Sequence, residues 1–100
     1  MIGVFDSGFG GLTVCREIIK RYPGQDIVFF ADIANFPYGS KSKAELRQFS
    51  KDICNFLITE GVDLIVVACN SASSVIDEEF RSNFDLPIFD VINSGVKSLE

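Results

Sequence analysis

Short apolar runs rich in Ile, Val and Phe alternate along the chain with segments of helical periodicity, and this alternation limits the fold more than any other feature. The runs span residues 2–5, 27–31, 64–68 and 88–91, the last opened by Pro87. Strands of this composition, separated by helices, are typical of a parallel sheet buried on both faces and joined by right-handed crossovers. We therefore predict an α/β fold with a parallel sheet of about four strands and helices on both faces.

The first two predicted helices each carry an apolar stripe that we expect to pack on the sheet. The first helix follows an Asp-Ser-Gly-Phe-Gly-Gly loop and ends at Pro23-Gly24, and the second covers residues 44–58 and ends before Gly61. The stripes consist of Leu12, Cys15, Ile18, Ile19 and Tyr22 in the first helix, and of Leu46, Phe49, Ile53, Phe56 and Leu57 in the second.

The remaining segments are rich in turn and capping residues. Residues 32–42 form a long loop of Asp, Asn, Pro, Gly and Ser, and such loops are candidate functional sites. Ser73 or Ser74 is expected to cap a third helix that reaches about Asn83, and Ser94-Gly95 is expected to begin another. We see no repeat or linker, and we predict one domain over residues 1–100.

Composition limits the function classes. The net charge of −5 argues against nucleic acid or an anionic membrane surface as the main partner. Three cysteines without a CxxC pair, and no histidine, argue against a zinc site or a disulfide scaffold and fit a reducing cytoplasm. The start MIGVFDSG lacks a signal-peptide pattern, and the longest apolar run is far too short to cross a bilayer. We expect a soluble cytoplasmic protein for which small polar metabolites remain possible ligands.

Three polar clusters follow the predicted strands. Asp6-Ser7 follows the first strand, Asp32 with the Pro37-Tyr38-Gly39 loop follows the second, and Cys69-Asn70-Ser71 follows the third. Parallel α/β sheets bind ligands outside the carboxyl ends of their strands. The three clusters are therefore expected to face one crevice.

Each cluster also has a purely structural interpretation. The glycines of Gly8–Gly11 resemble a phosphate cradle, yet Thr13 breaks the dinucleotide pattern GxGxxG, and a tight turn explains them equally well. Asp6 can be an N-cap and Ser7 a turn residue. Tyr38 can simply cover apolar surface.

The cysteines differ in their positions. Cys15 and Cys54 lie on or beside apolar helix stripes and are predicted to be small buried hydrophobes. Cys69 closes a strand and precedes a helix, where backbone N–H groups and the macrodipole can lower a thiol pKa from about 8.5 toward about 3.5–7.5. Without a histidine partner, this thiolate is a candidate for proton abstraction, or for a nucleophile whose partner lies on another chain.

Three motifs carry a resemblance to a known family. The segments IGVFDSGFGGLTV (2–14), DxAxxPYGxKS (32–42) and ACNSAS (68–73) resemble the three signatures of the amino-terminal half of bacterial glutamate racemases. The resemblance implies a flavodoxin-like half of a two-domain racemase fold. It also implies cofactor-independent interconversion of L- and D-glutamate, which supplies D-glutamate for peptidoglycan and so for cell wall biogenesis and cell shape.

The resemblance implies roles for the residues of the polar clusters. Removing the α-proton from one face of glutamate and returning one to the other is most directly done by two bases, and the family uses two cysteines. Cys69 corresponds to one of them, with Asp6 beside it as a catalytic residue that orients or tunes the thiol. The implied substrate-binding residues are Asp6, Ser7, Pro37, Tyr38, Gly39, Cys69, Asn70 and Ser71. No metal is implied.

The chain departs from the family pattern in several places. Ser71 replaces the usual threonine, Ile33 stands where a small hydroxyl residue is common, and Asn93-Ser94-Gly95 replaces a Glu-Pro-Gly segment. Family members also continue into a second half that brings the opposing cysteine and a histidine. We therefore expect this chain to be inactive alone, with the missing half, and a homodimer, as candidate partners. Alternatives are a non-catalytic α/β remnant that binds a partner, and an anion- or nucleotide-binding module that uses Gly8–Gly11.

Overall fold

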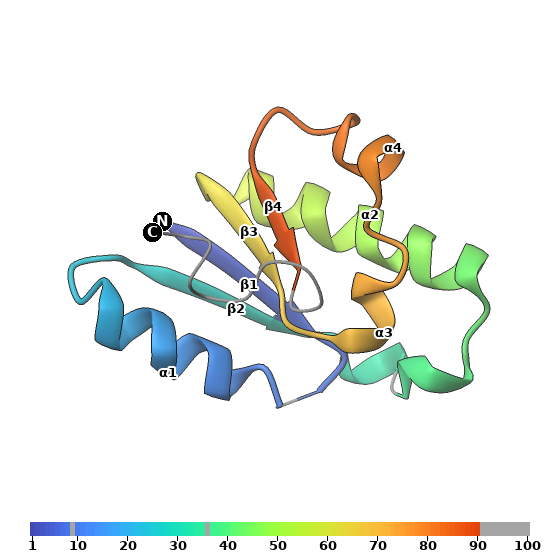
Figure 1. The fold of residues 1–100 in the computed structure, drawn as a ribbon, viewed down its shortest axis with the longest axis horizontal. Coiled ribbons are helices and arrows are strands. Elements are labelled where there is room, and N and C mark those ends of the chain that lie inside the picture. Colours follow the sequence, from blue (N-terminus) through green and yellow to red (C-terminus); the bar gives the residue numbers. More distant parts are fainter. Residues whose placement is uncertain (9, 36, 91–100) are drawn as a thin grey trace.

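The computed structural model describes residues 1–8, 10–35 and 37–90. Within these residues, strands and helices alternate as predicted (Figure 1). The elements are β1 (Ile2–Asp6), α1 (Leu12–Arg21), β2 (Ile27–Ala31), the 3-10 turns η1 (Ile33–Asn35) and η2 (Tyr38–Ser40), α2 (Lys43–Thr59), β3 (Leu64–Val67), α3 (Asn70–Ser73), α4 (Glu78–Arg81) and β4 (Ile88–Asp90).

The four strands form one parallel sheet in the order β2-β1-β3-β4. This is the order of the first four strands of a flavodoxin-like sheet. Phe5 of β1 lies in register with Phe30 of β2 and Val67 of β3, and Val67 pairs in turn with Asp90 of β4. The predicted α/β fold with four parallel strands is confirmed, and the register brings the carboxyl ends of all four strands to one edge.

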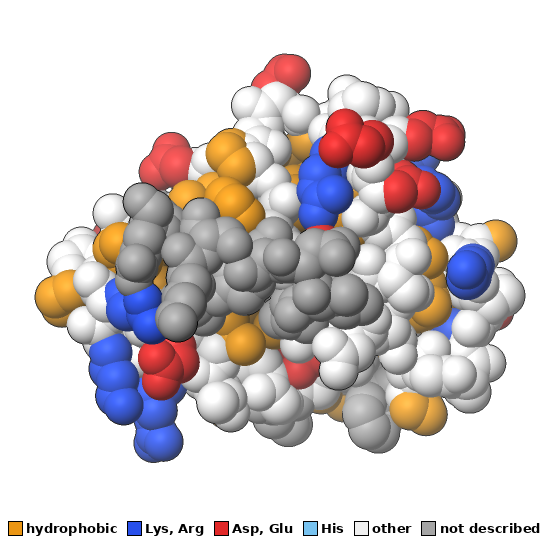
Figure 2. Space-filling view, in the orientation of Figure 1, with side chains coloured by type: hydrophobic (Ala, Val, Ile, Leu, Met, Phe, Trp, Pro, Cys, Tyr) orange, Lys and Arg blue, Asp and Glu red, His pale blue; other side chains and the backbone are white. Residues whose placement is uncertain are grey.

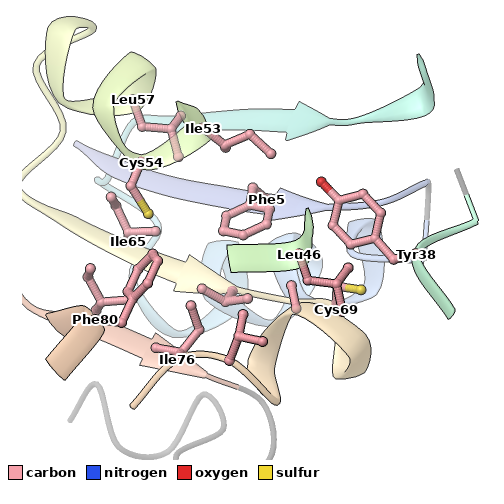
Figure 3. Close-up of a cluster of buried hydrophobic side chains, with 14 of the residues drawn as sticks. Phe5, Tyr38, Leu46, Ile53, Cys54, Leu57, Ile65, Cys69, Ile76 and Phe80 are labelled. Carbon is pink, nitrogen blue, oxygen red and sulfur yellow. The ribbon is translucent and has the colours of Figure 1, made fainter. Parts of the chain in front are cut away.

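Helices cover both faces of the sheet (Figure 1). On one face α1 packs over β1 through Cys15 and Ile18. On the other face α2, with α3 and α4, encloses the larger core cluster, which is shown in Figure 3. Its fully buried members include Phe5, Leu57 and Phe80. The sheet is therefore buried on both sides, as its continuous apolar strands require.

Local sequence explains both ends of α2. Ser42 and Glu45 form a capping box, in which the Ser42 hydroxyl accepts from the Glu45 N–H and the Glu45 carboxylate accepts from the Ser42 N–H, both at 3.1 Å. At the other end Gly61 adopts φ +90°, a left-handed conformation that suits glycine and terminates the helix. The predicted span 44–58 thus agrees with Lys43–Thr59 within one residue at each end.

The apolar stripes predicted for the first two helices are each wrong in part, because some of their residues are exposed to solvent. Leu12 and Ile19 are 51% and 55% exposed, because α1 is rotated so that Val14 joins Cys15 and Ile18 against the sheet. Leu12 and Ile19 are seven residues apart and so lie on the same flank of the helix, which the sheet does not reach. In α2, Phe56 is 44% exposed at the outer side of the sheet.

The predicted third helix is also wrong. Instead of one helix from Ser73 or Ser74 to Asn83, the chain forms α3 directly after Cys69 and then the separate α4. Val75 and Ile76 between them turn into the core, each 4% exposed. Asp77 then starts α4, because its carboxylate accepts from the N–H of Phe80 at 2.8 Å.

The predicted strands agree with the structure, except that β2 is less buried than predicted. β2 lies at a sheet edge and is half-buried along its length, whereas β1 in the centre is buried throughout. β4 runs to Asp90, and Val91 and the helix expected at Ser94-Gly95 lie outside the described residues. Figure 2 shows several basic side chains, with an acidic one among them, near α1, and acidic side chains with basic neighbours near α4.

Candidate functional site

Cys69 lies at the carboxyl end of β3, two residues beyond Val67, and is the N-cap of α3. It is 7% exposed, and its Sγ donates to Ser7 Oγ at 3.6 Å. Because α3 has four residues, its macrodipole is far smaller than that of a full helix, and the Cys69 side chain makes no capping hydrogen bond to the backbone of α3. The structure thus joins the first and third predicted clusters directly through Ser7 and Cys69.

Asp6 organises the loop between β1 and α1. Its buried carboxylate accepts from the backbone N–H of Ser7 at 2.7 Å and from that of Gly11 at 2.6 Å. A Cβ on Gly11 would lie 2.9 Å from Phe29 Cε1 and 3.1 Å from Ala68 Cβ, so this position requires glycine for close approach. The interpretation of Asp6 as an N-cap is therefore wrong, because the N-cap of α1 is Gly11, whose N–H the Asp6 carboxylate binds. The contacts of Asp6 set Ser7 beside Cys69.

The same contacts weaken the phosphate-cradle interpretation of Gly8–Gly11. A phosphate site needs backbone N–H groups that are free to bind an anion. Here the N–H groups of Ser7 and Gly11 bind the Asp6 carboxylate instead. A phosphate at this loop would have to displace that carboxylate or lie beside its negative charge.

Asp32 anchors the loop that contains Tyr38. Its backbone N–H donates to the carbonyl of Asp6 at 2.8 Å, which ties the two loops together. Its carboxylate accepts from the Tyr38 hydroxyl at 2.5 Å and from Asn35 Nδ2 at 3.0 and 3.1 Å. Both donors are neutral, and among the residues that the structure describes no cation pairs with the Asp32 carboxylate.

Tyr38 is 1% exposed and belongs to the same buried cluster as Cys69. Its ring centroid lies 5.8 Å from that of Phe49, and Figure 3 shows Tyr38 and Cys69 at the same end of the cluster. Burial raises the pKa of Tyr38, and its hydrogen bond to Asp32 and the negative charges of Asp32, Cys69 and Asp6 raise the pKa further. Tyr38 therefore stays a protonated donor, and it both covers apolar surface and holds Asp32.

The other predicted site residues lie around this arrangement. Pro37 and Gly39 are exposed and flank Tyr38 at η2, which contacts α3. Asn70 is exposed and Ser71 is half-buried, both in α3 directly after Cys69. We call the surface formed by Asp6, Ser7, Asp32, Pro37, Tyr38, Gly39, Cys69, Asn70 and Ser71 the polar edge. The described residues also form hollows of about 230, 240 and 310 Å³; Asp32 lines the second of them, and none of the three is lined by Cys69.

Sequence reasoning missed the Asp90 carboxylate and the contact that the Asp32 carboxylate makes. Asp32 was expected to face the crevice but not to hold Tyr38. Asp90, the last residue of β4, is 1% exposed and pairs with Arg81, whose Nε also donates to the Ile88 carbonyl at 3.0 Å. The sequence does contain a signal, since β1 and β4 end in Phe-Asp and Asp32 directly follows β2.

The two other cysteines are buried, as predicted. Cys15 is 7% exposed on α1, and Cys54 is fully buried on α2, on the opposite face of the sheet. Burial raises the pKa of both thiols, that of Cys54 to about 12. Neither residue is at the polar edge, so Cys69 is the one cysteine that the described structure brings there.

The described part of the chain contains neither a cluster of metal-ligating side chains nor a membrane-spanning helix. No three His, Cys, Asp or Glu side chains within residues 1–8, 10–35 and 37–90 are grouped so that they could hold a metal ion. In the same residues, no helix combines the length and apolar character needed to cross a membrane.

Known proteins match this chain over nearly its whole length, although no family model matches it. It is 50% identical over 96 residues to the glutamate racemase of Aquifex aeolicus, covering 96% of this chain and 38% of that protein. The glutamate racemase structure from Aquifex pyrophilus superposes with a TM-score of 0.89 at 48% identity, over 96% of this chain and 38% of that one. The structure of the Escherichia coli glutamate racemase, in complex with L-glutamate and the activator UDP-MurNAc-Ala, superposes with a TM-score of 0.84 at 38% identity. This match covers 89% of this chain and 34% of that one.

The fold is that of an α/β domain with a cysteine at the carboxyl end of a parallel sheet. The sequence and structure matches then give the particular resemblance: over nearly its whole length, the chain is similar to glutamate racemases. It spans little more than a third of the length of the relatives that it matches.

Proposed function

We propose that this chain supplies one half of the active site of a glutamate racemase, an isomerase that interconverts L- and D-glutamate without a cofactor. The observation that carries the proposal is the position of Cys69, at the end of a parallel strand, against Ser7 and next to the loop held by Asp6. The racemases that match the chain, and the L-glutamate bound to the Escherichia coli relative, support glutamate as the substrate.

In this proposal Cys69 is one of two bases that act on the α-carbon. As a thiolate it removes the α-proton from one face, and as a thiol it returns a proton to the same face in the reverse direction. Ser7 Oγ lies within reach of both the Cys69 sulfur, at 3.6 Å, and Asp6 Oδ1, at 3.5 Å. The second distance is at the long limit of a hydrogen bond, so Asp6 acts mainly by shaping the loop that presents Ser7.

The exposed groups around Cys69 are suited to hold an amino acid. Asn70 and Ser71 follow Cys69 directly at the start of α3, and Gly39 in η2, which contacts α3, has a backbone N–H. Pro37 has no N–H and lines this half-site beside Tyr38. Donors placed there would bind the substrate carboxylate and stabilise the negative charge that develops on it when the α-proton leaves. We propose these residues, with Ser7 and Tyr38, as the substrate contacts of this half-site.

The opposing base comes from outside the described residues in this proposal. Racemisation needs a proton donor on the face opposite Cys69, and Cys15 and Cys54 are buried in helices away from the polar edge. The missing racemase half is the source that we propose, with a homodimer as the competing source. The resemblance to the family supports a role in the cytoplasm, supplying D-glutamate for peptidoglycan and thereby for cell shape.

Proton exchange at the α-carbon tests the proposal. The purified chain is incubated with L-glutamate in D2O, and the α-proton signal is followed by NMR. We expect exchange without net formation of D-glutamate, lost in Cys69→Ala and kept in the matched buried-cysteine variant Cys54→Ala. If no exchange occurs while the Cys69 thiol still reacts with an alkylating agent, the half-site acts on glutamate only when its other half is present. Equal exchange in Cys69→Ala, or a Cys69 no more reactive than Cys54, would contradict the proposal.

A further inference from the structure

A concave surface lies between the outer strand β2 and helix α2. It has a volume of about 240 Å³. Its walls include three phenylalanines and three polar side chains: Phe30, Phe49, Phe56, Asp32, Asn35 and Asp52. We call it the β2 hollow. Of these residues, Asp32 alone is also part of the polar edge.

The aromatic side chains give the β2 hollow an apolar wall. The rings of Phe30 and Phe56 lie with centroids 5.5 Å apart at an interplanar angle of 59°. Phe56 is 44% exposed there, although its position on α2 suggests burial. Aromatic faces carry a negative quadrupole and attract cations placed over them, in addition to packing against apolar groups.

The charges of the β2 hollow all have one sign. Asp32 is 8% exposed and Asp52 is exposed, and no Lys or Arg is among the described residues that line the hollow. Each carboxylate is held by neutral donors: Asp32 by Tyr38 and Asn35, and Asp52 by Gln48 Nε2 at 2.9 Å. Two negative charges beside three aromatic rings, with no ion pair to a described residue, leave the hollow complementary to a cation.

We propose that the β2 hollow binds a small organic cation with an apolar body, such as an arylalkyl ammonium ion. The ammonium group lies between Asp32 and Asp52, and the apolar body packs against Phe30 and Phe56. A carboxylate–ammonium contact and a cation–π contact then act together in a partly desolvated place. A neutral ligand of the same shape loses both contacts, and an anion is repelled.

Such a ligand would contact the rear of the loop that leads to the polar edge. Asp32 accepts the Tyr38 hydroxyl, and Tyr38 shares the buried cluster of Cys69. Binding at the β2 hollow therefore changes the surroundings of Tyr38 without contact at Cys69. The proposal does not depend on racemase activity, because it is tested by binding alone.

The test uses the 15N-labelled chain, with benzylammonium as probe and benzyl alcohol as its neutral match, at fixed ionic strength. We expect saturable shifts at Phe30, Asp52 and Phe56, with smaller shifts at Tyr38, and a Kd of about 1 mM. The alcohol is expected to bind at least about tenfold more weakly.

Two variants with matched charge change locate the site. Asp52→Asn is expected to weaken benzylammonium binding by about three- to tenfold, whereas Asp85→Asn, an exposed carboxylate at a different hollow, leaves it unchanged. Because Asp52 is exposed, its change should not disturb folding, and the amide spectrum verifies this directly. Equal binding of alcohol and ammonium, or equal effects of the two variants, would overturn the proposal.

Discussion

Cys54 and Cys69 belong to the same buried cluster, at opposite ends of it, yet their surroundings differ completely (Figure 3). Cys54 is in the middle of α2 with Leu57 and Ile53 on the same helix. Cys69 is at a strand end against the Ser7 hydroxyl. Their exposures, 0% and 7%, hardly differ. Burial alone therefore does not separate a structural thiol from a candidate base, whereas the polar partners and the strand end do.

The largest expected difference between the two thiols is in alkylation. Because burial raises the pKa of Cys54 to about 12, almost none of it is thiolate at pH 7.5. We expect Cys69 to react with iodoacetamide at least about 100-fold faster than Cys54 in the native chain, as read by peptide mass spectrometry. Unfolding in guanidinium serves as the control, since it should bring the two rates together. Equal alkylation rates of Cys54 and Cys69 in the native chain would contradict the proposed difference between a structural thiol and a candidate base.

A change at Gly11 tests whether the loop next to Cys69 is held by close packing. In Gly11→Ala the new Cβ meets the Phe29 ring at 2.9 Å and Ala68 at 3.1 Å, so we expect a loss of about 1–3 kcal/mol in the free energy of unfolding. Gly24→Ala is the matched control, because nothing lies within 4 Å of its added Cβ. Urea denaturation measures both, and a similar loss in the two variants would argue against tight packing at Gly11.

The two tyrosines allow a test of the Asp32 anchor. Tyr38→Phe removes a donor from a buried carboxylate and is expected to cost about 1–2 kcal/mol. Tyr22→Phe removes a buried hydroxyl that has no hydrogen-bond partner among the described residues, so it is expected to be neutral or slightly stabilising. Thermal and urea unfolding of the pair measure the difference. If Tyr22→Phe is less stable than Tyr38→Phe, the hydrogen bond from Tyr38 to Asp32 is not an important source of stability.

The smallest effect concerns alkaline pH. A thiol whose pKa is raised by folding stabilises the native state below the unfolded pKa, about 8.5, and this contribution is lost as pH rises toward the folded value. Between pH 9 and 10 we expect Cys54 to lower the free energy of unfolding by about 1 kcal/mol. In Cys54→Ala this part of the pH slope should vanish, while Cys69→Ala should retain it. If the pH dependence of the free energy of unfolding is unchanged in Cys54→Ala, other groups cause it, and Tyr38 is the first candidate.

Local signals in the sequence were sufficient for the strands and for the cysteines. Residues 2–5, 27–31 and 64–68 are apolar without interruption, and the structure has strands at each of them. Cys15 and Cys54 were separable from Cys69 by their helical positions. The third helix was mispredicted because Val75 and Ile76 fit a helical pattern, yet their burial breaks the helix into α3 and α4.

The polar edge was predicted as a set of residues but not as a network. Asp6, Ser7 and Cys69 were expected together because parallel strands end at one side of a sheet, and they contact each other. The bond between Asp32 and Tyr38 was not foreseen, because a six-residue loop can place two side chains in many ways. The role of each polar-edge residue in binding substrate stays a prediction.

The sequence by itself determined the alternation of strands and helices, the capping of α2 and the place of Cys69 at a strand end, because these depend on neighbours within a few residues. Tertiary structure alone decided that α1 turns Leu12 and Ile19 to solvent and that β2 is an outer strand. It also decided that Phe30, Phe56 and Asp52 form one hollow. These features depend on which surfaces meet across long sequence separations. The identity of an apolar residue and of its sequence neighbours does not specify which distant surface, if any, will cover it.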